Sequence, residues 1–186
     1  MNNKAQYPIE VYSDGSSIGN PGPSGAAYII RYYEEINGDF ILREIEKVKG
    51  FRLSTNNRME IISATDALEE IRAMIAAETI KGAITINLFS DSKYFCDAIN
   101  LRWVDKWEEN NWVTSTQTPV KNRDLWEYTI KTIEALKQFG CQININHIPG
   151  HKGYKFNEIC DKLANNAARS QNDQLIDEVY ESQNKR

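Results

Sequence analysis

Residues 9–25 read Ile-Glu-Val-Tyr-Ser-Asp-Gly-Ser-Ser-Ile-Gly-Asn-Pro-Gly-Pro-Ser-Gly, and this stretch sets the start of the fold. The β-prone run from Ile9 to Tyr12 predicts a short strand, which ends at Ser13-Asp14-Gly15. The strand is therefore expected to open into a loop at a carboxylate. The glycines and prolines that follow fit a rigid turn, but bare backbone there also lets a partner molecule approach closely.

Two runs of apolar, aromatic and β-branched residues, 26–33 and 40–51, flank the turn signal Asn37-Gly38. Together with the first strand, this pattern predicts a hairpin or meander. A continuous apolar run over 83–89 is typical of a central strand that is covered on both faces. That run ends at Ser90-Asp91-Ser92, so a second carboxylate also follows a strand.

Helical periodicity begins after the meander. Over 55–77 the apolar residues step by three and four positions and form one stripe: Ile61, Ala64, Leu68, Ile71 and Ile75. Further helices are predicted over 124–139 and 157–169, with a strand at 142–148 between them. The resulting order βββαβαβα predicts an α/β protein with a five-stranded mixed sheet flanked by helices.

The composition excludes several classes of protein. The chain has 186 residues, 41% of them hydrophobic, and a formal charge of −4. No run approaches the roughly 20 apolar residues of a membrane span, and the N-terminus lacks the apolar core of a secretory signal. Three separated cysteines without a Cys-x-x-Cys pair indicate reduced thiols. We therefore expect one cytoplasmic domain, which an acidic charge would not hold on nucleic acid by bulk attraction.

Four acids share an unusual setting, after predicted strands or early in predicted helices: Asp14, Glu60, Asp91 and Asp161. Each acid alone fits a structural role, as a turn former or as a complement to a helix dipole. If strands one and four are neighbours, however, the four acids converge at one edge of the sheet. A divalent cation such as Mg²⁺ or Mn²⁺ would relieve their repulsion, and two such ions about 4 Å apart would support phosphodiester cleavage.

The sequences around these acids resemble the motifs of type 1 ribonuclease H, in the order of that family. The matching strings are DGSSIGNPGPSG (14–25), TNNRME (55–60), SDSKY (90–94), and PGHKG (149–153) with NEICDKLA (157–164). The resemblance covers roughly residues 8–170, which are expected to form the catalytic domain. Residues 171–186 are expected to form a polar tail. Leu175, Ile176 and Val179 could tether part of it, but the tail is expected to fray.

This resemblance implies a ribonuclease H-like fold and an endoribonuclease that cuts the RNA strand of RNA–DNA hybrids, leaving 5′-phosphate and 3′-hydroxyl ends. It implies two Mg²⁺ ions, with Mn²⁺ as a possible substitute. Asp14 would bridge both ions, Asp91 would complete the nucleophile side, and Glu60 and Asp161 would serve the leaving-group side. His151, in a loop between glycines, would assist proton transfer or product release, because a flexible histidine can titrate near neutral pH.

Substrate contacts are implied in the same way. Asn20, Asn56 and Asn57 match positions that contact the RNA strand, and Thr55 and Asn122 match a pocket for a DNA phosphate. Neutral donors suit this work, since they position a backbone without reading bases.

Residues 100–112 correspond to a basic protrusion that grips the hybrid in the family. Trp103 is expected to meet the DNA sugars, although tryptophans at this spacing also fit simple packing. Residues 93–123 carry five basic and four acidic side chains, net +1, so the charge of this protrusion is diluted. We expect modest hybrid affinity with a shallow salt dependence.

Two other functions stay open at this level. A non-catalytic hybrid-binding module is the first, and the loss of any one of the four acids would have favoured it. A ribonuclease H-like enzyme that cuts DNA is the second, and Asn56-Asn57 and the motif around Asp161 argue against it. The expected partner is an RNA–DNA hybrid, and the protein is expected to be monomeric and free of membranes.

Overall fold

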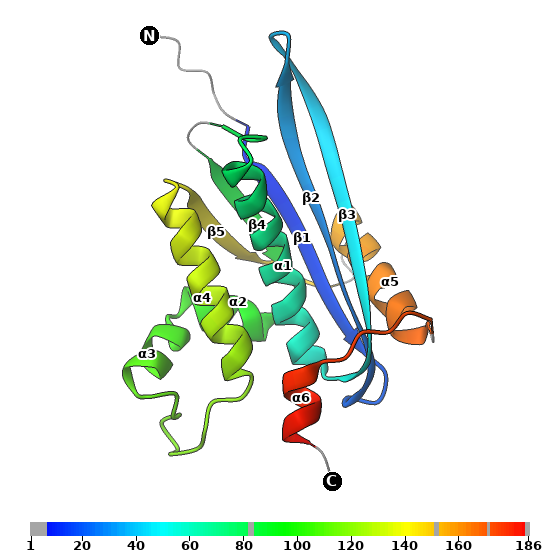
Figure 1. Ribbon diagram of the computed structural model, residues 1–186, viewed down its shortest axis with the longest axis vertical. Helices are drawn as coiled ribbons and strands as arrows, with labels where there is room; N and C mark the ends of the chain where they lie inside the picture. Colours follow the sequence, from blue (N-terminus) through cyan, green and yellow to red (C-terminus); the bar gives the residue numbers. More distant parts are fainter. Residues whose placement is uncertain (1–6, 82–83, 151–152, 171, 185–186) are drawn as a thin grey trace.

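A computed structural model describes residues 7–81, 84–150, 153–170 and 172–184 of the chain. It forms one five-stranded sheet with helices on both faces (Figure 1). The strands are β1 Ile9–Ser17, β2 Gly22–Ile36, β3 Asp39–Ser54, β4 Thr85–Ser90 and β5 Gln142–His147. The helices are α1 Asn56–Ala76, α2 Lys93–Asn100, α3 Trp103–Glu109, α4 Arg123–Gln138, α5 Lys155–Arg169 and α6 Glu178–Gln183. The predicted α/β class and five-stranded mixed sheet are confirmed.

The strand order of the sheet is β3-β2-β1-β4-β5. The first three strands form an antiparallel meander, whereas β4 and β5 run parallel to β1. Strands β1 and β4 are neighbours, as the convergence of the carboxylates requires. Because they are parallel, the chain leaves both of them toward the same edge of the sheet.

The hairpin of β2 and β3 is longer than the sequence pattern indicated. The two strands pair as far as Ile36 and Asp39. Asn37 and Gly38 have φ angles of 53° and 92°, which a two-residue turn with the twist of a hairpin requires. The polar residues next to the turn hid this continuation, although Glu34 binds Arg43 across the strands at 2.7 Å.

The two faces of the sheet bury different sets of side chains, because successive residues of a strand point to opposite sides. On one face, Tyr28 and Ile30 belong to the main core with the apolar stripe of α1 and with α2 and α4. On the other face, Ala27 and Ile29 pack against Cys160 and Ala164 of α5. The helices of the described ranges include none with the length and apolar character of a membrane span.

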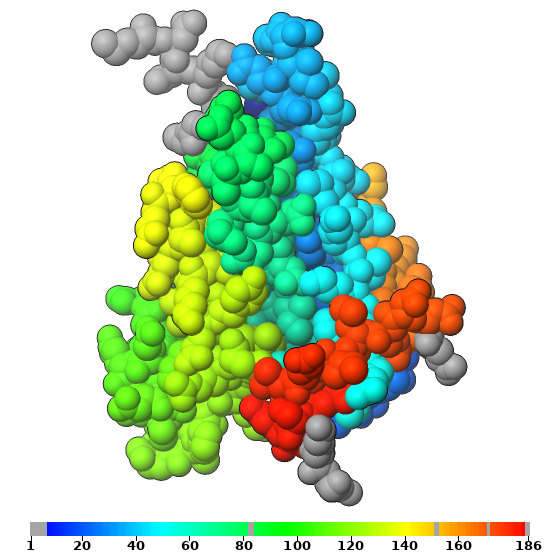
Figure 2. All heavy atoms as spheres, viewed as in Figure 1, coloured from blue at the N-terminus to red at the C-terminus, as the bar shows by residue number. Residues whose placement is uncertain are grey.

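The prediction that the C-terminal segment frays is wrong for residues 172–184. The Leu175 N–H donates to Gly50 at 2.8 Å, and the Arg52 N–H donates to Leu175 at 3.1 Å, so this segment pairs with the edge of β3. Figure 2 shows the segment lying across the lower end of the hairpin. Its anchors are backbone pairing and buried charge, which a polar local sequence does not reveal.

Candidate active site

Three carboxylates meet at one edge of the sheet: Asp14 of β1, Glu60 of α1, and Asp91, which directly follows β4. One oxygen each from Asp14, Glu60 and Asp91 lies within 4.8 Å of the other two. Asp14 and Glu60 are buried, and Asp91 is half-buried. The cluster forms because β1 and β4 are parallel neighbours, so that both strands point toward the start of α1.

The sequence predicted that Asp14 lies at the end of the first strand. In the structure it lies inside β1. The antiparallel pairing with β2 continues to Ser17, whereas the parallel pairing with β4 stops at Tyr12. Asp14 therefore lies two residues beyond Tyr12, the last residue of β1 that pairs with β4. Gly15 allows this placement, because a Cβ there would overlap the backbone of Met59 and Glu60.

The cluster is electrostatically costly without a cation. Burial, together with the charges of Asp91 and Asp161, raises the pKa of Asp14 to about 8, although a hydrogen bond from the Gly15 N–H lowers it in part. Burial likewise raises the pKa of Glu60 well above its ordinary value, with added repulsion from Asp14 and Asp91. Without a cation, burial and mutual repulsion favour the protonated, neutral form of these carboxyls. A bound cation would favour the ionised form.

The donor set fits a hard divalent cation. Glu60 Oε1 accepts a bond from Asn56 Nδ2 at 3.3 Å, while its buried Oε2 has no partner among the described residues. An unpartnered buried oxygen beside two further carboxylates is what oxygen-ligated ions such as Mg²⁺ and Mn²⁺ require. Asp14, Glu60 and Asp91 would hold such an ion.

The raised pKa values predict how the metal-free protein responds to pH. Between pH 4 and about 8 the folded Asp14 binds more protons than the unfolded chain does, so the free energy of unfolding falls as pH rises through this range. In EDTA we expect the Tm to be lower at pH 8 than at pH 5, and Mg²⁺ to restore it at pH 8. Thermal unfolding monitored by circular dichroism checks this. A Tm in EDTA that rises from pH 5 to pH 8 would contradict the assignment.

Asp161 lies beside this cluster and not within it. Its charge raises the pKa of Asp14, which shows that it is near. Its Oδ1, however, accepts a hydrogen bond from Asn165 Nδ2 at 2.7 Å. Asn165 Oδ1 in turn accepts from the Ser16 hydroxyl at 3.0 Å, so Asn165 connects the carboxylate to the C-terminal end of β1.

Asp91 is held by residues that the sequence interpretation did not single out. The buried Asn157 donates to Asp91 Oδ2 at 3.2 Å, and Gly150 packs so closely that a Cβ would meet the same oxygen. His147 Nε2 lies 3.3 Å from the Asp91 carbonyl oxygen. Asn157 and Gly150 both stand in the matched motif strings, which was the available signal. His151 lies outside the described residues.

The predicted RNA-strand residues lie around the start of α1. Asn20 Oδ1 accepts the Asn56 N–H at 3.0 Å, which connects the loop after β1 to that helix. Asn57 is exposed. Asn56 also reaches Glu60, so this group borders the carboxylate cluster.

Thr55 and Asn122 occupy equivalent positions in two helices, since each is the N-cap residue, of α1 and α4 respectively. Thr55 Oγ1 accepts the Arg58 N–H at 3.4 Å. Asn122 has a left-handed backbone, and its side chain makes no capping bond. Two helix N-termini with polar side chains suit an anion.

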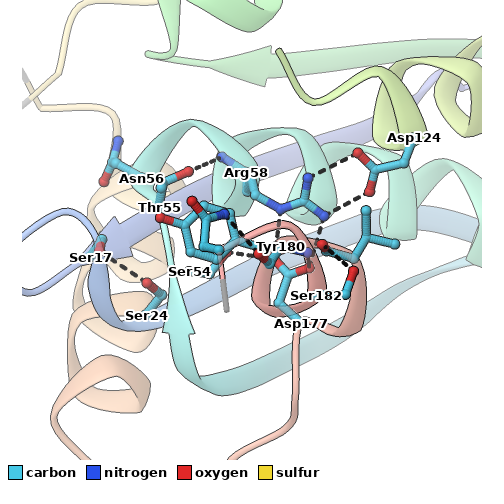
Figure 3. Close-up of polar contacts among 12 residues, drawn as sticks. Ser17, Ser24, Ser54, Thr55, Asn56, Arg58, Asp124, Asp177, Tyr180 and Ser182 are labelled. Atoms are coloured by element: carbon cyan, nitrogen blue, oxygen red, sulfur yellow. Dashed lines mark hydrogen bonds and ion pairs between the residues drawn. The ribbon is translucent and has the colours of Figure 1, made fainter. Parts of the chain in front are cut away.

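A buried arginine lies between these two helix starts (Figure 3). Arg58 is 2% exposed. It donates to both oxygens of Asp124 at 2.9 and 2.7 Å and to both oxygens of Asp177 at 2.6 and 2.8 Å. Burial lowers the pKa of this guanidinium, but the hydrogen bonds that it donates to the two carboxylates, and their charges, outweigh burial and raise the pKa. Sequence reasoning missed this network, because it joins residues 66 and 119 positions apart.

The tryptophan segment is packed onto the body of the protein. Trp103 is half-buried, with its ring centroid 6.3 Å from that of Trp107, which itself lies 5.9 Å from Trp126. Trp112 is buried. Two basic residues here are paired with acids, Arg102 with Asp105 at 2.6 Å and Arg123 with Glu127 at 2.8 Å, so the positive charge is further diluted.

Comparison with known proteins gives consistent results. The RNase H family model matches residues 6–169. Ribonuclease HI of Pasteurella multocida is 38% identical over 176 residues, which are 95% of this chain and 98% of the relative. LC9-RNase H1, a type 1 RNase H with the type 2 active-site motif, is 26% identical with a TM-score of 0.66, over 97% of this chain and 82% of that one. LC11-RNase H1, solved in complex with an RNA/DNA hybrid, is 21% identical with a TM-score of 0.56, over 86% and 96%.

Proposed function

The chain belongs to the ribonuclease H family, and on this premise we propose that it is an endoribonuclease that hydrolyses the RNA strand of RNA–DNA hybrids. The products would carry 5′-phosphate and 3′-hydroxyl ends. The observation that carries the proposal is the cluster of Asp14, Glu60 and Asp91, which lies where the matched motifs meet. A binding module would have no use for three mutually repelling carboxylates, two of them buried.

Two Mg²⁺ ions, or Mn²⁺ in their place, would supply an activated water and stabilise the departing oxygen. We assign Asp14 to both ions, Asp91 to the side of the attacking water, and Glu60 with Asp161 to the side of the leaving oxygen. Asn157 and Gly150 would orient Asp91 for its role, because both contact one of its oxygens.

The remaining site residues are proposed to bind and to move protons. Asn20, Asn56 and Asn57 would contact the RNA strand beside the cluster, where Asn56 also orients Glu60. His151 is proposed to carry a proton to the leaving oxygen or to assist product release.

The DNA strand would lie on the other side of the start of α1. Thr55 and Asn122 would bind one of its phosphates, and Trp103 would contact a sugar. Residues 8–170 would form the catalytic domain, and we propose that the enzyme is a cytoplasmic monomer.

A cleavage assay tests this function. End-labelled RNA–DNA hybrid, duplex RNA and duplex DNA of one sequence are incubated with the protein in Mg²⁺ or in EDTA. We expect cleavage of the hybrid RNA strand in Mg²⁺ only. Binding of the hybrid without cleavage would instead identify a non-catalytic module, and cleavage of duplex DNA would identify a DNA nuclease of the same fold.

A further inference from the structure

The C-terminal segment holds a buried carboxylate against the start of α1. Asp177 is 6% exposed. Its Oδ2 accepts hydrogen bonds from the Ser54 hydroxyl and from Arg58 Nε, both at 2.6 Å, and its Oδ1 accepts from Arg58 Nη2 at 2.8 Å. Ser54 is the last residue of β3 and precedes Thr55. The segment therefore holds Ser54, directly before Thr55, and Arg58, three residues after it.

The same guanidinium reaches the start of α4. Arg58 binds Asp124, in the first turn of that helix, through two parallel hydrogen bonds. Asn122 is the N-cap of α4, two residues before Asp124. The positions of Thr55 and Asn122 relative to each other thus depend on one arginine that is clamped between two carboxylates (Figure 3).

The charges of the network suit this place. One guanidinium and two carboxylates carry a net charge of −1, next to the positive N-terminal ends of α1 and α4. The bidentate contacts on each side of the planar guanidinium fix its orientation. Loss of Asp177 would leave Arg58 with a carboxylate partner on α4 alone. The guanidinium would then be free to shift toward Asp124, and its position relative to the start of α1 would change.

We propose that Asp177 is a positioning residue for the contact between the protein and the DNA strand of the hybrid: it holds Arg58 so that Thr55 and Asn122 are set at the spacing of one phosphate. This inference rests on the proposed function, and it gives the C-terminal segment a part in substrate binding. Asp177 does not touch the substrate.

Removal of the Asp177 charge separates positioning from simple electrostatics. If the carboxylate acted only as a nearby negative charge, its loss would strengthen binding of a phosphate and lower the KM. Positioning predicts the opposite. For Asp177→Asn we expect the KM for hybrid to rise about three- to tenfold, with kcat unchanged, at a temperature well below the Tm of both proteins. Asp173→Asn is the matched control, because this exposed residue lies in the same segment outside the network, and it should leave both constants unchanged.

A phosphate scan tests the route of the effect. Hybrids are prepared with a single neutral methylphosphonate at successive positions of the DNA strand, and the KM of each is measured. The natural protein should lose affinity at one position, the phosphate bound by Thr55 and Asn122. In Asp177→Asn that particular loss should vanish, because the contact is already missing and the two changes are not additive.

The outcomes are distinct. If no methylphosphonate position raises the KM of the natural protein, the proposed phosphate contact does not exist, and the inference is overturned with it. The cleavage assay decides separately whether the proposed function holds. A sensitive position that persists in Asp177→Asn would overturn the inference alone, as would an unchanged or lower KM. If Asp177→Asn does not fold, Ser54→Ala, which removes only the hydroxyl donor to Asp177, should show the same loss of sensitivity to a smaller degree.

Discussion

Asp14→Asn is expected to abolish hybrid cleavage, with kcat reduced by a factor of roughly 1,000 or more. An oxygen of this carboxylate lies within 4.8 Å of oxygens of Glu60 and Asp91, and we propose that Asp14 would hold both ions. Metal-ion catalysis contributes several kcal/mol of transition-state stabilisation, and each 1.36 kcal/mol corresponds to about a tenfold change in rate. An amide has the size of the carboxylate but lacks its charge. Single-turnover cleavage of labelled hybrid in Mg²⁺ measures the effect.

Stability provides the control for this variant. Because Asp14 is a buried carboxylate repelled by its neighbours, its neutralisation should raise the Tm of the protein in EDTA at pH 8. An inactive variant with a higher Tm cannot owe its inactivity to unfolding. Asp39→Asn, at the exposed hairpin turn, should leave both activity and Tm unchanged. Cleavage by Asp14→Asn at more than a tenth of the normal rate would refute the assigned role.

The sequence predicted the elements whose information is local. The apolar stripe of α1, the turn at Asn37-Gly38 and the continuous apolar run of β4 are each readable within a few residues. The carboxylates Asp14, Glu60 and Asp91 were placed together by an argument from topology, and parallel pairing of β1 with β4 confirms its premise.

The limits of prediction lie where one residue depends on a distant one. Nothing near Asp177 distinguishes it from an exposed acid of a polar tail, since its partner Arg58 is 119 positions away. Asp161 looks equivalent to the other acids in its motif, but its bond to Asn165 sets its carboxylate beside the cluster. Such placements follow from tertiary packing and not from periodicity.

The charge of the chain also changes its meaning with the structure. Three of the four proposed metal ligands are gathered in one cluster, so much of the −4 is local to a cation site. Asp124 and Asp177 are neutralised in part by Arg58. The acidic composition is thus compatible with nucleic-acid binding, although two of the five basic residues over 93–123, Arg102 and Arg123, are held in ion pairs.

Arg58→Met is expected to be the most destabilising of the substitutions considered, at about 3–5 kcal/mol. Removal of one partner of a buried ion pair leaves the other charges buried without compensation. Here two carboxylates lose four hydrogen bonds at once, and Asp177 is itself only 6% exposed. For a domain of this size, the loss corresponds to a fall in Tm of roughly 6–20 °C. Urea denaturation followed by circular dichroism gives the free energy of unfolding.

Arg52→Met is the matched control, because it makes the same chemical change at an arginine that also binds the C-terminal segment. Arg52 donates to both carboxylate oxygens of Glu181, but its side chain is 54% exposed. Solvent can replace such a contact, so this variant should lose far less stability than Arg58→Met. Arg52 connects β3 to the C-terminal segment, and Arg58 connects α1 to the same segment. The difference between the stability losses of the two variants therefore reports the effect of burying the ion pair, apart from the effect of holding the segment. Equal losses in the two would show that the segment is held by its connections alone, and that the buried charge of Asp177 contributes nothing specific.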